Sequence, residues 1–353
     1  MISTEYLFLL FLVSIYVWRP NVKELKWIIP FFFLFFGMSR GLMVGTDHFG
    51  YKDGFMYFHG FDSKNWDRFH FEKGYLFLIA LFKLFSHNYL LFASLTFILY
   101  IGGILLFMNY YKVNNSWQYF LFYTLGFYFF GYNTMRQTIG IALTLAFIDF
   151  LYKKKYVYFG ILTLLIAFLM HKSGAILLLL IPIHYFSEKI KYIPKKTLYI
   201  VVILSFLSYY IGQKFIKGFF TDFVTLIGFD DDYNRYIEYE SENMGNLLSG
   251  MYTLFALILI YLKSKSGDRF CFYVYIFSVI LFNLGNMMNG RATRMSLGFM
   301  YFIIPLIPLM LTKEPTKYKW ILKTITIVFC IVYFFRSYYF ANCGLINPYY
   351  YAF

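Results

Sequence analysis

Charged residues are scarce in this sequence, and their scarcity excludes several classes of protein. Only 14% of the 353 residues are charged, whereas 60% belong to the hydrophobic set. Soluble globular domains carry roughly 25% charged residues, so a water-soluble enzyme is excluded. A disordered chain is excluded as well, because disorder requires low hydrophobicity.

Cysteines and nucleotide-binding motifs are also few or missing. The three cysteines have no CxxC spacing, so the sequence predicts neither a disulfide framework nor a zinc site. Neither a phosphate-binding GxxxxGK[ST] loop nor a dinucleotide fingerprint is present. The N-terminus has no basic region and no small-residue cleavage site, so we interpret it as a retained span rather than a signal peptide. We therefore expect no cofactor and no metal.

Apolar segments occupy most of the chain. A membrane helix needs about 20 residues, so about twelve spans would use roughly 240 residues and leave no room for a soluble domain. The sequence predicts a single all-α, polytopic membrane domain covering residues 1–353. The expected spans are 2–18, 27–43, 89–109, 117–132, 135–152, 156–170, 173–186, 197–212, 247–262, 270–287, 295–311 and 319–337.

The apolar segment 74–85 is too short to cross a membrane alone, so we expect a re-entrant or interfacial helix there. If segment 74–85 does not cross the membrane, the inside loops hold more than half of the 32 Lys and Arg residues, but only four acids. Cytoplasmic loops show this bias, which predicts twelve crossings with both termini on the outer side. Because the net charge of +14 is scattered over short loops, nucleic-acid binding is not expected.

Two longer outer loops, 40–73 and 213–246, hold most of the acids. Long loops in a compact protein are often functional. Asp47 and Glu72 are candidates for a general base or for hydrogen bonds to a sugar hydroxyl, and simple solvation is the alternative. The acidic, aromatic run 230–240 would suit carbohydrate binding, but taken alone it is better explained as a solvated surface.

Several cations lie at the outer ends of spans, where the positive-inside rule does not expect them. They are Arg40, Arg136, Lys172, Arg291, Arg294 and Arg336. Charge near hydrocarbon is costly and is usually functional or paired, and arginine makes bidentate contacts to phosphate. A converging group would suit a diphosphate, although pairing with loop acids or lipid phosphates remains an alternative. We assign the diphosphate to Arg136, Arg291 and Arg294, supported by Arg40 and Lys172.

His171 is the outer histidine best placed at a helix boundary, between an apolar span and the sequence KSG. Histidine acts as a general base near neutral pH, so His171 is the predicted catalytic base, with Asp47 as the second candidate. A structural histidine bound to backbone is the alternative. The other histidines show no metal-ligand spacing.

In these and neighbouring residues, the sequence resembles the EpsG branch of the Wzy-type bacterial polysaccharide polymerases. The resemblance covers most of the chain and rests on short motifs in a particular order. The motifs are G-x-D-x-x-x-Y (Gly45, Asp47, Tyr51), E-x-G-Y (Glu72, Gly74, Tyr75), N-x-x-R-Q (Asn133, Arg136, Gln137), H-x-S (His171, Ser173), R-x-x-R (Arg291, Arg294) and the tail NPYYYAF.

The resemblance implies a GT-C-like glycosyltransferase of the bacterial inner membrane. Such an enzyme moves a growing glycan from undecaprenyl diphosphate onto the non-reducing end of another lipid-linked repeat unit, at the outer face. We expect inversion at the anomeric carbon, and we expect the motif residues Tyr51, Glu72 and Gln137 to bind substrate. A chain-length regulator is a further partner that the resemblance leaves open.

Two other functions remain possible at this point. A flippase or transporter of lipid-linked oligosaccharide would place cations along the middle of the bundle rather than at one face. A membrane O-acyltransferase would need an inward acyl-donor site, whereas the inside loops here are short and basic.

Overall fold

The computed structural model describes residues 2–62, 66, 71–190, 192–211, 245–262, 268–288, 292–313 and 316–352. This part of the chain is helical, and a single antiparallel bridge between Arg40 and Tyr351 is its only strand-like pairing. The described residues fall into two compact units, Met1–Ile181 with Cys330–Phe353 (unit 1) and Pro182–Phe329 (unit 2).

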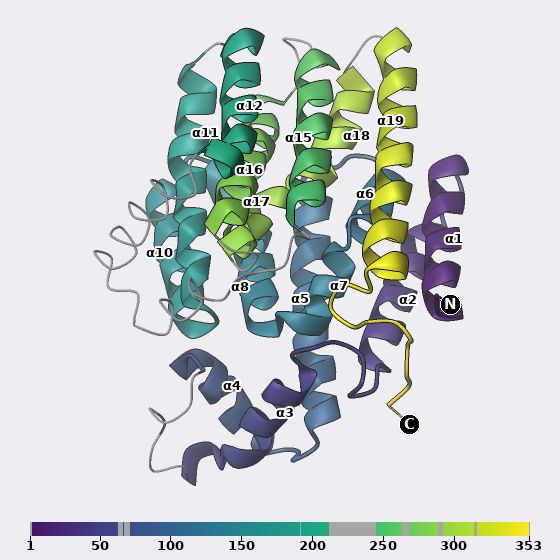
Figure 1. Cartoon of the computed structure of the whole chain (residues 1–353). Coiled ribbons are helices and arrows are strands. Elements are labelled where there is room, and N and C mark those ends of the chain that lie inside the picture. The colour runs from purple at the N-terminus through teal and green to yellow at the C-terminus, as the bar shows by residue number, and fades with distance from the viewer. Residues whose placement is uncertain are drawn as a thin grey trace. The chain divides into compact units, whose positions relative to one another are not determined.

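Unit 1 contains the helices of the N-terminal half of the chain (Figure 1). They are α1 (Thr4–Trp18), α2 (Leu25–Met38), α3 (His48–Tyr57), α4 (Lys73–Lys83), α5 (Tyr89–Tyr110), α6 (Asn115–Thr124), α7 (Phe127–Asn133), α8 (Met135–Ala146), α9 (Asp149–Tyr152), α10 (Tyr156–Leu169) and the 3-10 helix Lys172–Leu179. A π-helical turn, Phe335–Phe340, leads into the C-terminal tail.

Unit 2 is built mainly from long apolar helices. They are α12 (Lys195–Ile211), α15 (Gly245–Leu262), α16 (Arg269–Met288), the 3-10 helix Ala292–Ser296, α17 (Leu297–Met300) and α18 (Ile303–Lys313), while α11 (Leu180–Lys189) and α19 (Thr316–Phe334) run across the division between the units. Asn283 of α16 donates to Thr253 of α15 at 2.9 Å and to Ser205 of α12 at 3.0 Å. One buried amide thus joins three helices, as polar side chains commonly do in membranes.

Each expected span contains helix, but several are interrupted. The expected span 117–132 breaks at Gly126, whose φ of +79° ends α6 and starts α7. The span 295–311 consists of two helical pieces bent by 41°. Three described helical segments are long and apolar enough to cross a membrane (Tyr89–Tyr110, Arg269–Asn286 and Tyr318–Phe340), and the bent pair would be a fourth. These helices fit a multi-pass membrane protein, and the number twelve stays a prediction.

The segment 40–73 differs from its prediction as a loop, because it contains α3. Gly50 and Gly54 and the low hydropathy of this stretch conceal the helix, which is stabilised by packing: Phe55 is fully buried and its ring lies 5.2 Å from that of Phe92. The expected short helix at 74–85 is present as α4. Together α3 and α4 lie at one end of the helices of unit 1 (Figure 1).

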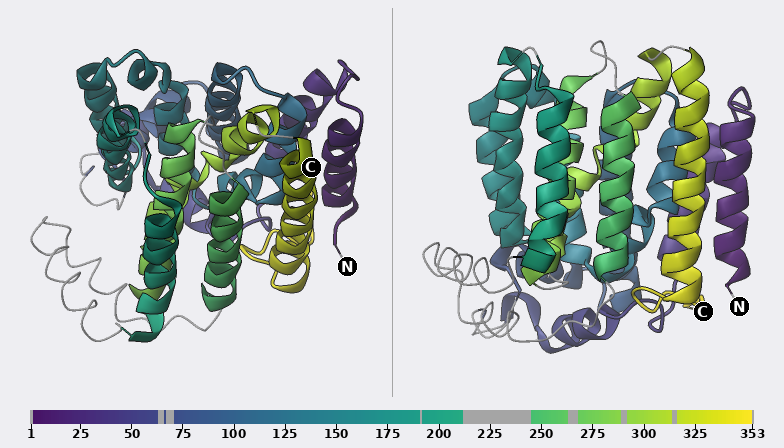
Figure 2. Two further views of the ribbon diagram at one scale, coloured as in Figure 1. Left: turned by 90° about the horizontal axis from the view of Figure 1, so that it is seen from above. Right: turned by 45° about the horizontal axis from the view of Figure 1, so that its top comes forward.

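Both chain ends also lie at this end of unit 1 (Figure 2). The side chain of Asn347 accepts hydrogen bonds from the amide (3.0 Å) and hydroxyl (2.9 Å) of Ser3. Tyr349 donates to the carbonyl of Phe36 at 2.6 Å, and its hydroxyl lies 2.9 Å from that of Ser39. The C-terminal tail therefore joins the start of α1 to the end of α2.

Candidate active site

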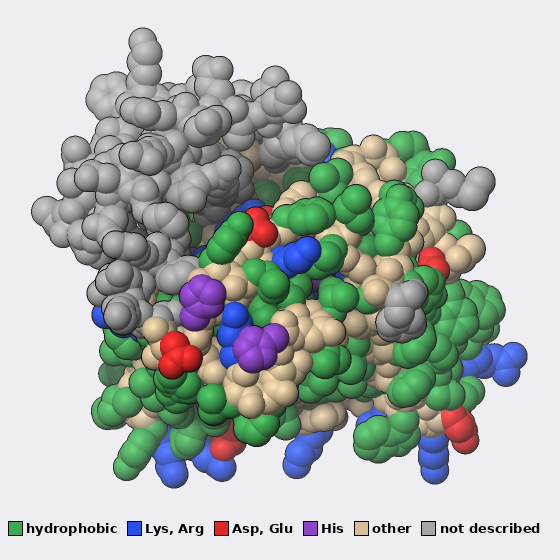
Figure 3. Space-filling view, turned by 90° about the horizontal axis from the view of Figure 1, so that it is seen from below, with side chains coloured by type: hydrophobic (Ala, Val, Ile, Leu, Met, Phe, Trp, Pro, Cys, Tyr) green, Lys and Arg blue, Asp and Glu red, His purple; other side chains and the backbone are tan. Residues whose placement is uncertain are grey.

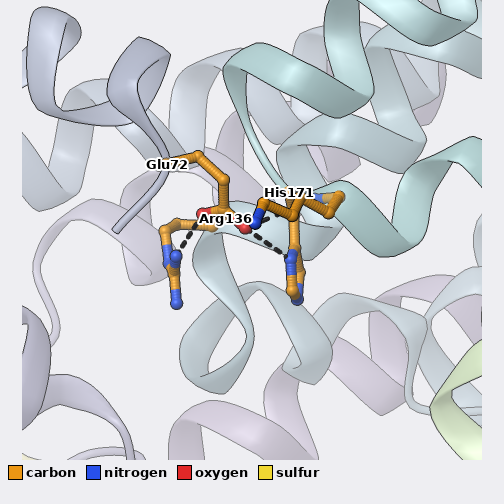
Figure 4. A network of polar contacts seen from close by, with 4 residues as sticks. Glu72, Arg136 and His171 are labelled. Carbon is orange, nitrogen blue, oxygen red and sulfur yellow. Dashed lines mark hydrogen bonds and ion pairs between the residues drawn. The ribbon is translucent and has the colours of Figure 1, made fainter. Parts of the chain in front are cut away.

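Three side chains that are distant in sequence meet in unit 1 (Figure 4). The carboxylate of Glu72 forms an ion pair through Oε2 with Nη1 of Arg136. Its other oxygen, Oε1, lies 2.9 Å from Nδ1 of His171 and accepts the backbone N–H of Lys172 at 3.3 Å. One carboxylate therefore connects two residues that lie 64 and 99 positions away along the chain.

Helix ends bring these groups together. Glu72 directly precedes α4, Arg136 is the second residue of α8, and His171 stands between α10 and the 3-10 helix that follows. Gly74 makes this approach possible, because a Cβ atom there would lie 2.4 Å from the Cα of Leu169 in α10. The start of α4 can thus touch the end of α10, two residues before His171.

Aromatic rings surround the Arg136 guanidinium. Its carbon lies 4.6 Å from the ring centroid of Phe71 and 5.9 Å from those of Tyr51 and Tyr75. Rings at such distances attract a cation through their quadrupole. Tyr51 comes from α3, so the unexpected helix contributes directly to the site. Arg136 is held by a carboxylate and three rings, and its side chain is 17% exposed.

The charge state of Glu72 follows from these contacts. Burial tends to raise the pKa of this carboxyl, but the hydrogen bond from His171 and the positive charge of Arg136 outweigh burial and lower the pKa to about 2. Glu72 is therefore ionised throughout the neutral range. Its side chain is only 9% exposed, whereas that of His171 is 28% exposed, so the imidazole is the member of the pair that solvent or a ligand can reach.

A second polar contact lies just before Arg136. Oδ1 of Asn133 accepts the backbone N–H of Thr46 at 2.6 Å and its hydroxyl at 3.2 Å. The hydroxyl of Thr46 also contacts Oδ1 of Asp47 at 3.0 Å. A Cβ atom on Gly344 would lie 2.2 Å from Nδ2 of Asn133. Segment 45–47, the tail and the end of α7 thus meet at one amide.

An ionised carboxylate that holds an imidazole beside cations is suited to proton transfer near an anionic group. On the face of the molecule that is seen from below, histidine, acidic and basic side chains lie among hydrophobic ones (Figure 3). Within the described ranges, no three His, Cys, Asp or Glu side chains are grouped to hold a metal ion.

The family model of the EpsG family matches residues 24–351, nearly the whole chain. The chain belongs to the EpsG family. No curated protein and no solved structure matches it. The resemblance found in the motifs is therefore confirmed, and family membership supports a membrane enzyme of the polysaccharide-polymerase, glycosyltransferase-like type.

The EpsG-type motifs of unit 1 converge in the structure. Tyr51, Glu72, Arg136 and His171 lie in or around one cluster, and Asn133 links the first motif to the tail. Lys172 contributes its backbone N–H to Glu72, and its side chain is exposed. Gln137 follows Arg136 in α8 and is buried at 7% exposure.

Arg40 lies in a closed environment. It is 2% exposed, its Nη1 donates to the carbonyl of Gly37 at 2.8 Å, and its guanidinium carbon lies 4.7 Å from the ring centroid of Tyr132 and 5.1 Å from that of Phe97. A cation at the C-terminal end of α2 is also stabilised by the helix dipole. In this conformation Arg40 is not open to a ligand, so its predicted role beside a diphosphate has no support from the geometry.

The remaining predicted cations belong to other segments of the chain. Arg294 belongs to the 3-10 helix of unit 2, where its side chain is exposed, and Arg291 and the run 230–240 lie outside the described residues. Arg336 lies in the π-helical turn.

The sequence did not indicate the roles of Phe71, Gly74 and Asn133. Gly74 and Asn133 belong to recognised motifs, but only the packing of α4 on α10 and of segment 45–47 on the end of α7 shows what they contact.

Proposed function

We propose that this protein is a polysaccharide polymerase that moves a glycan from undecaprenyl diphosphate onto the non-reducing end of a second lipid-linked repeat unit, at the outer face of the bacterial inner membrane. Membership of the EpsG family supports the polymerase type. The observation that carries the proposal is the single carboxylate, Glu72, which binds both His171 and Arg136.

His171 acts as the general base in this proposal. In the neutral tautomer whose Nδ1 carries hydrogen, His171 donates to Glu72, and Nε2 keeps its lone pair. Nε2 takes the proton of the acceptor hydroxyl as that oxygen bonds to the anomeric carbon. The ionised Glu72 stabilises the imidazolium that forms. Asp47 remains the second candidate for the base.

The bond from the anomeric carbon to the lipid diphosphate breaks in the same step, and the diphosphate leaves with the bonding electrons. Its added negative charge is stabilised by cations that are already in place. Arg136 and Lys172 supply this charge in unit 1, and Arg291 and Arg294 are proposed to add to it. Attack on the face opposite the leaving group inverts the anomeric carbon.

The proposal also includes an architecture, further substrate contacts and a protein partner. We propose a GT-C-like architecture and substrate contacts from Tyr51 and Gln137, and a chain-length regulator remains a proposed partner.

Purified protein in vesicles, given only the lipid-linked repeat unit, should produce a ladder of longer glycans. The variant His171→Gln should lower the rate by about 100-fold or more, because general-base catalysis typically contributes that much. The control His87→Gln changes an exposed histidine of unit 1 and should leave the ladder unchanged.

Three results would contradict the proposal in different ways. A protein that forms no ladder but moves the lipid-linked unit across the vesicle membrane would be a flippase. A need for an acyl donor would indicate an O-acyltransferase. A normal ladder from His171→Gln would remove His171 as the base while keeping the polymerase.

A further inference from the structure

Helix α4 and the turn that follows it carry an apolar stripe that stays largely exposed in the described part of the chain, with only the edge contact of Phe61 on Phe77 against it. The stripe consists of Phe77, Leu81, Leu84 and Phe85, which are 52%, 42%, 64% and 83% exposed. Their spacing of four, three and one places them on one side of a helix. The opposite side of α4 is buried in unit 1 through residues such as Tyr75, Leu76 and Ile79.

The stripe is free of charge. Lys83 is the only charged residue between Gly74 and Phe85. Its Nζ points away from the stripe, because it donates to the carbonyl of Phe58 at 2.6 Å and lies 4.7 Å from the ring centroid of Phe55. Binding of Lys83 within unit 1 therefore leaves a continuous apolar surface.

The length of α4 restricts what can cover this surface. Its 11 residues extend only about 16 Å, at about 1.5 Å per residue, whereas the hydrocarbon core is about 30 Å thick. The helix cannot cross the bilayer alone. A helix with one apolar face and one face packed on protein is suited to the membrane interface.

Helix α5, which follows α4 along the chain, indicates what contacts the apolar stripe. Helix α5 is long and apolar enough to cross the membrane, and it begins at Tyr89, four residues after Phe85. Leu91, in the first turn of α5, is 55% exposed. The stripe is thus followed along the chain, after three residues, by a helix that is long and apolar enough to span the membrane and that exposes an apolar side chain in its first turn.

We propose that the α4 stripe lies in the interfacial region of the bilayer and contacts lipid. Of the two arrangements expected for this segment, the interfacial helix is the one that the buried opposite face supports. Glu72 stands at the other end of α4, about 18 Å from Leu84 along the helix axis. If the proposed function holds, the candidate active site lies near the level from which a lipid-linked substrate approaches.

Site-directed fluorescence tests the proposal in vesicles. Leu81→Cys and Phe85→Cys, each labelled with an environment-sensitive dye, are compared in a background in which Cys271, Cys330 and Cys343 are replaced by alanine. Leu91→Cys serves as the lipid-facing control, and Asp53→Cys, at an exposed position of α3, serves as the water-facing control.

Labels at 81 and 85 should emit at shorter wavelength than the label at 53, and a spin-labelled phospholipid should quench them as it quenches the label at 91. Quenching by aqueous iodide instead would overturn the proposal. Protection from both quenchers would also overturn it, because the stripe would then be covered by protein.

A second measurement keeps the native cysteines. Phe85 is replaced by the photo-crosslinking residue benzoylphenylalanine, with the buried Phe92 as the matched control position. Crosslinks to lipid at 85 and not at 92 would support the proposal, whereas crosslinks at 85 only to protein would refute it. Neither measurement requires polymerase activity, so failure here is distinct from failure of the proposed function.

Discussion

At the scale of single residues, one carboxylate organises the candidate site. Glu72 is 9% exposed, and such a charge is tolerated only when it is paired and hydrogen-bonded. Arg136 and His171 supply the pairing, and the backbone N–H of Lys172 supplies a further hydrogen bond. Burial opposes ionisation, but these partners outweigh it, and the pKa of Glu72 falls to about 2.

The ionised form of Glu72 should make stability depend on pH. Because its pKa in the folded protein is about 2 and its ordinary value is 4.5, Glu72 stabilises the fold fully above about pH 4.5 and progressively less as the pH falls toward 2. The contribution is about 3 kcal/mol at neutral pH, since one pKa unit corresponds to about 1.4 kcal/mol. Glu72→Gln should unfold at lower temperature at pH 7 and lose less stability between pH 5 and pH 3 than the wild type.

Thermal unfolding in detergent at several pH values measures this difference. Asp62→Asn, at an exposed position in unit 1, should follow the wild type at each pH. Equal pH dependence of Glu72→Gln and the wild type would show that the carboxylate does not pair as described.

At the scale of helices, close packing depends on a few small residues. Helix α5 has two neighbouring glycines with different surroundings. A Cβ atom on Gly103 would lie 2.8 Å from the backbone of Ala142 in α8, whereas one on Gly102 would meet nothing within 4 Å. Small residues let helix backbones approach closely in membranes. Gly103 therefore sets the separation between α5 and α8, the helix that carries Arg136.

This pair of glycines provides an internally controlled test. Gly103→Ala should destabilise unit 1 by about 1–3 kcal/mol, the usual cost of overpacking, and should weaken polymer formation because it shifts α8. Gly102→Ala should be neutral or stabilise by up to about 1 kcal/mol, since alanine favours helix over glycine. Unfolding temperatures of the two variants in one detergent measure the difference. Equal effects would mean that the α5–α8 contact is looser than described.

At the scale of the whole chain, the described helices match the expected apolar segments, and the helix ends that form the candidate site lie at one end of unit 1. The ends of α2 and α10, the starts of α4, α5 and α8, and both chain termini lie at the same end of this unit. The side of the membrane on which this end stands is predicted by loop charge rather than by packing.

Reporter fusions test this orientation. With α4 as a non-crossing helix, alkaline phosphatase fused after His87 should be active, because it would lie on the outer side. The same enzyme fused after Asn114 should be inactive, and green fluorescent protein should show the reverse pattern. If α4 crossed the membrane, both positions would exchange sides, and phosphatase activity at 114 would disprove the predicted topology.

Composition and hydropathy by themselves determined that this is a helical membrane protein and where its apolar helices lie, because these properties depend on local residue content. Short motifs likewise indicated Glu72, Arg136 and His171 and the EpsG family. Only the tertiary structure decided that Glu72 bridges the other two, that Gly74 admits α4 against α10, that Arg40 is enclosed and that α3 is a helix. These features depend on contacts between segments tens of residues apart, and no local pattern of residues encodes which distant side chain fills a given space.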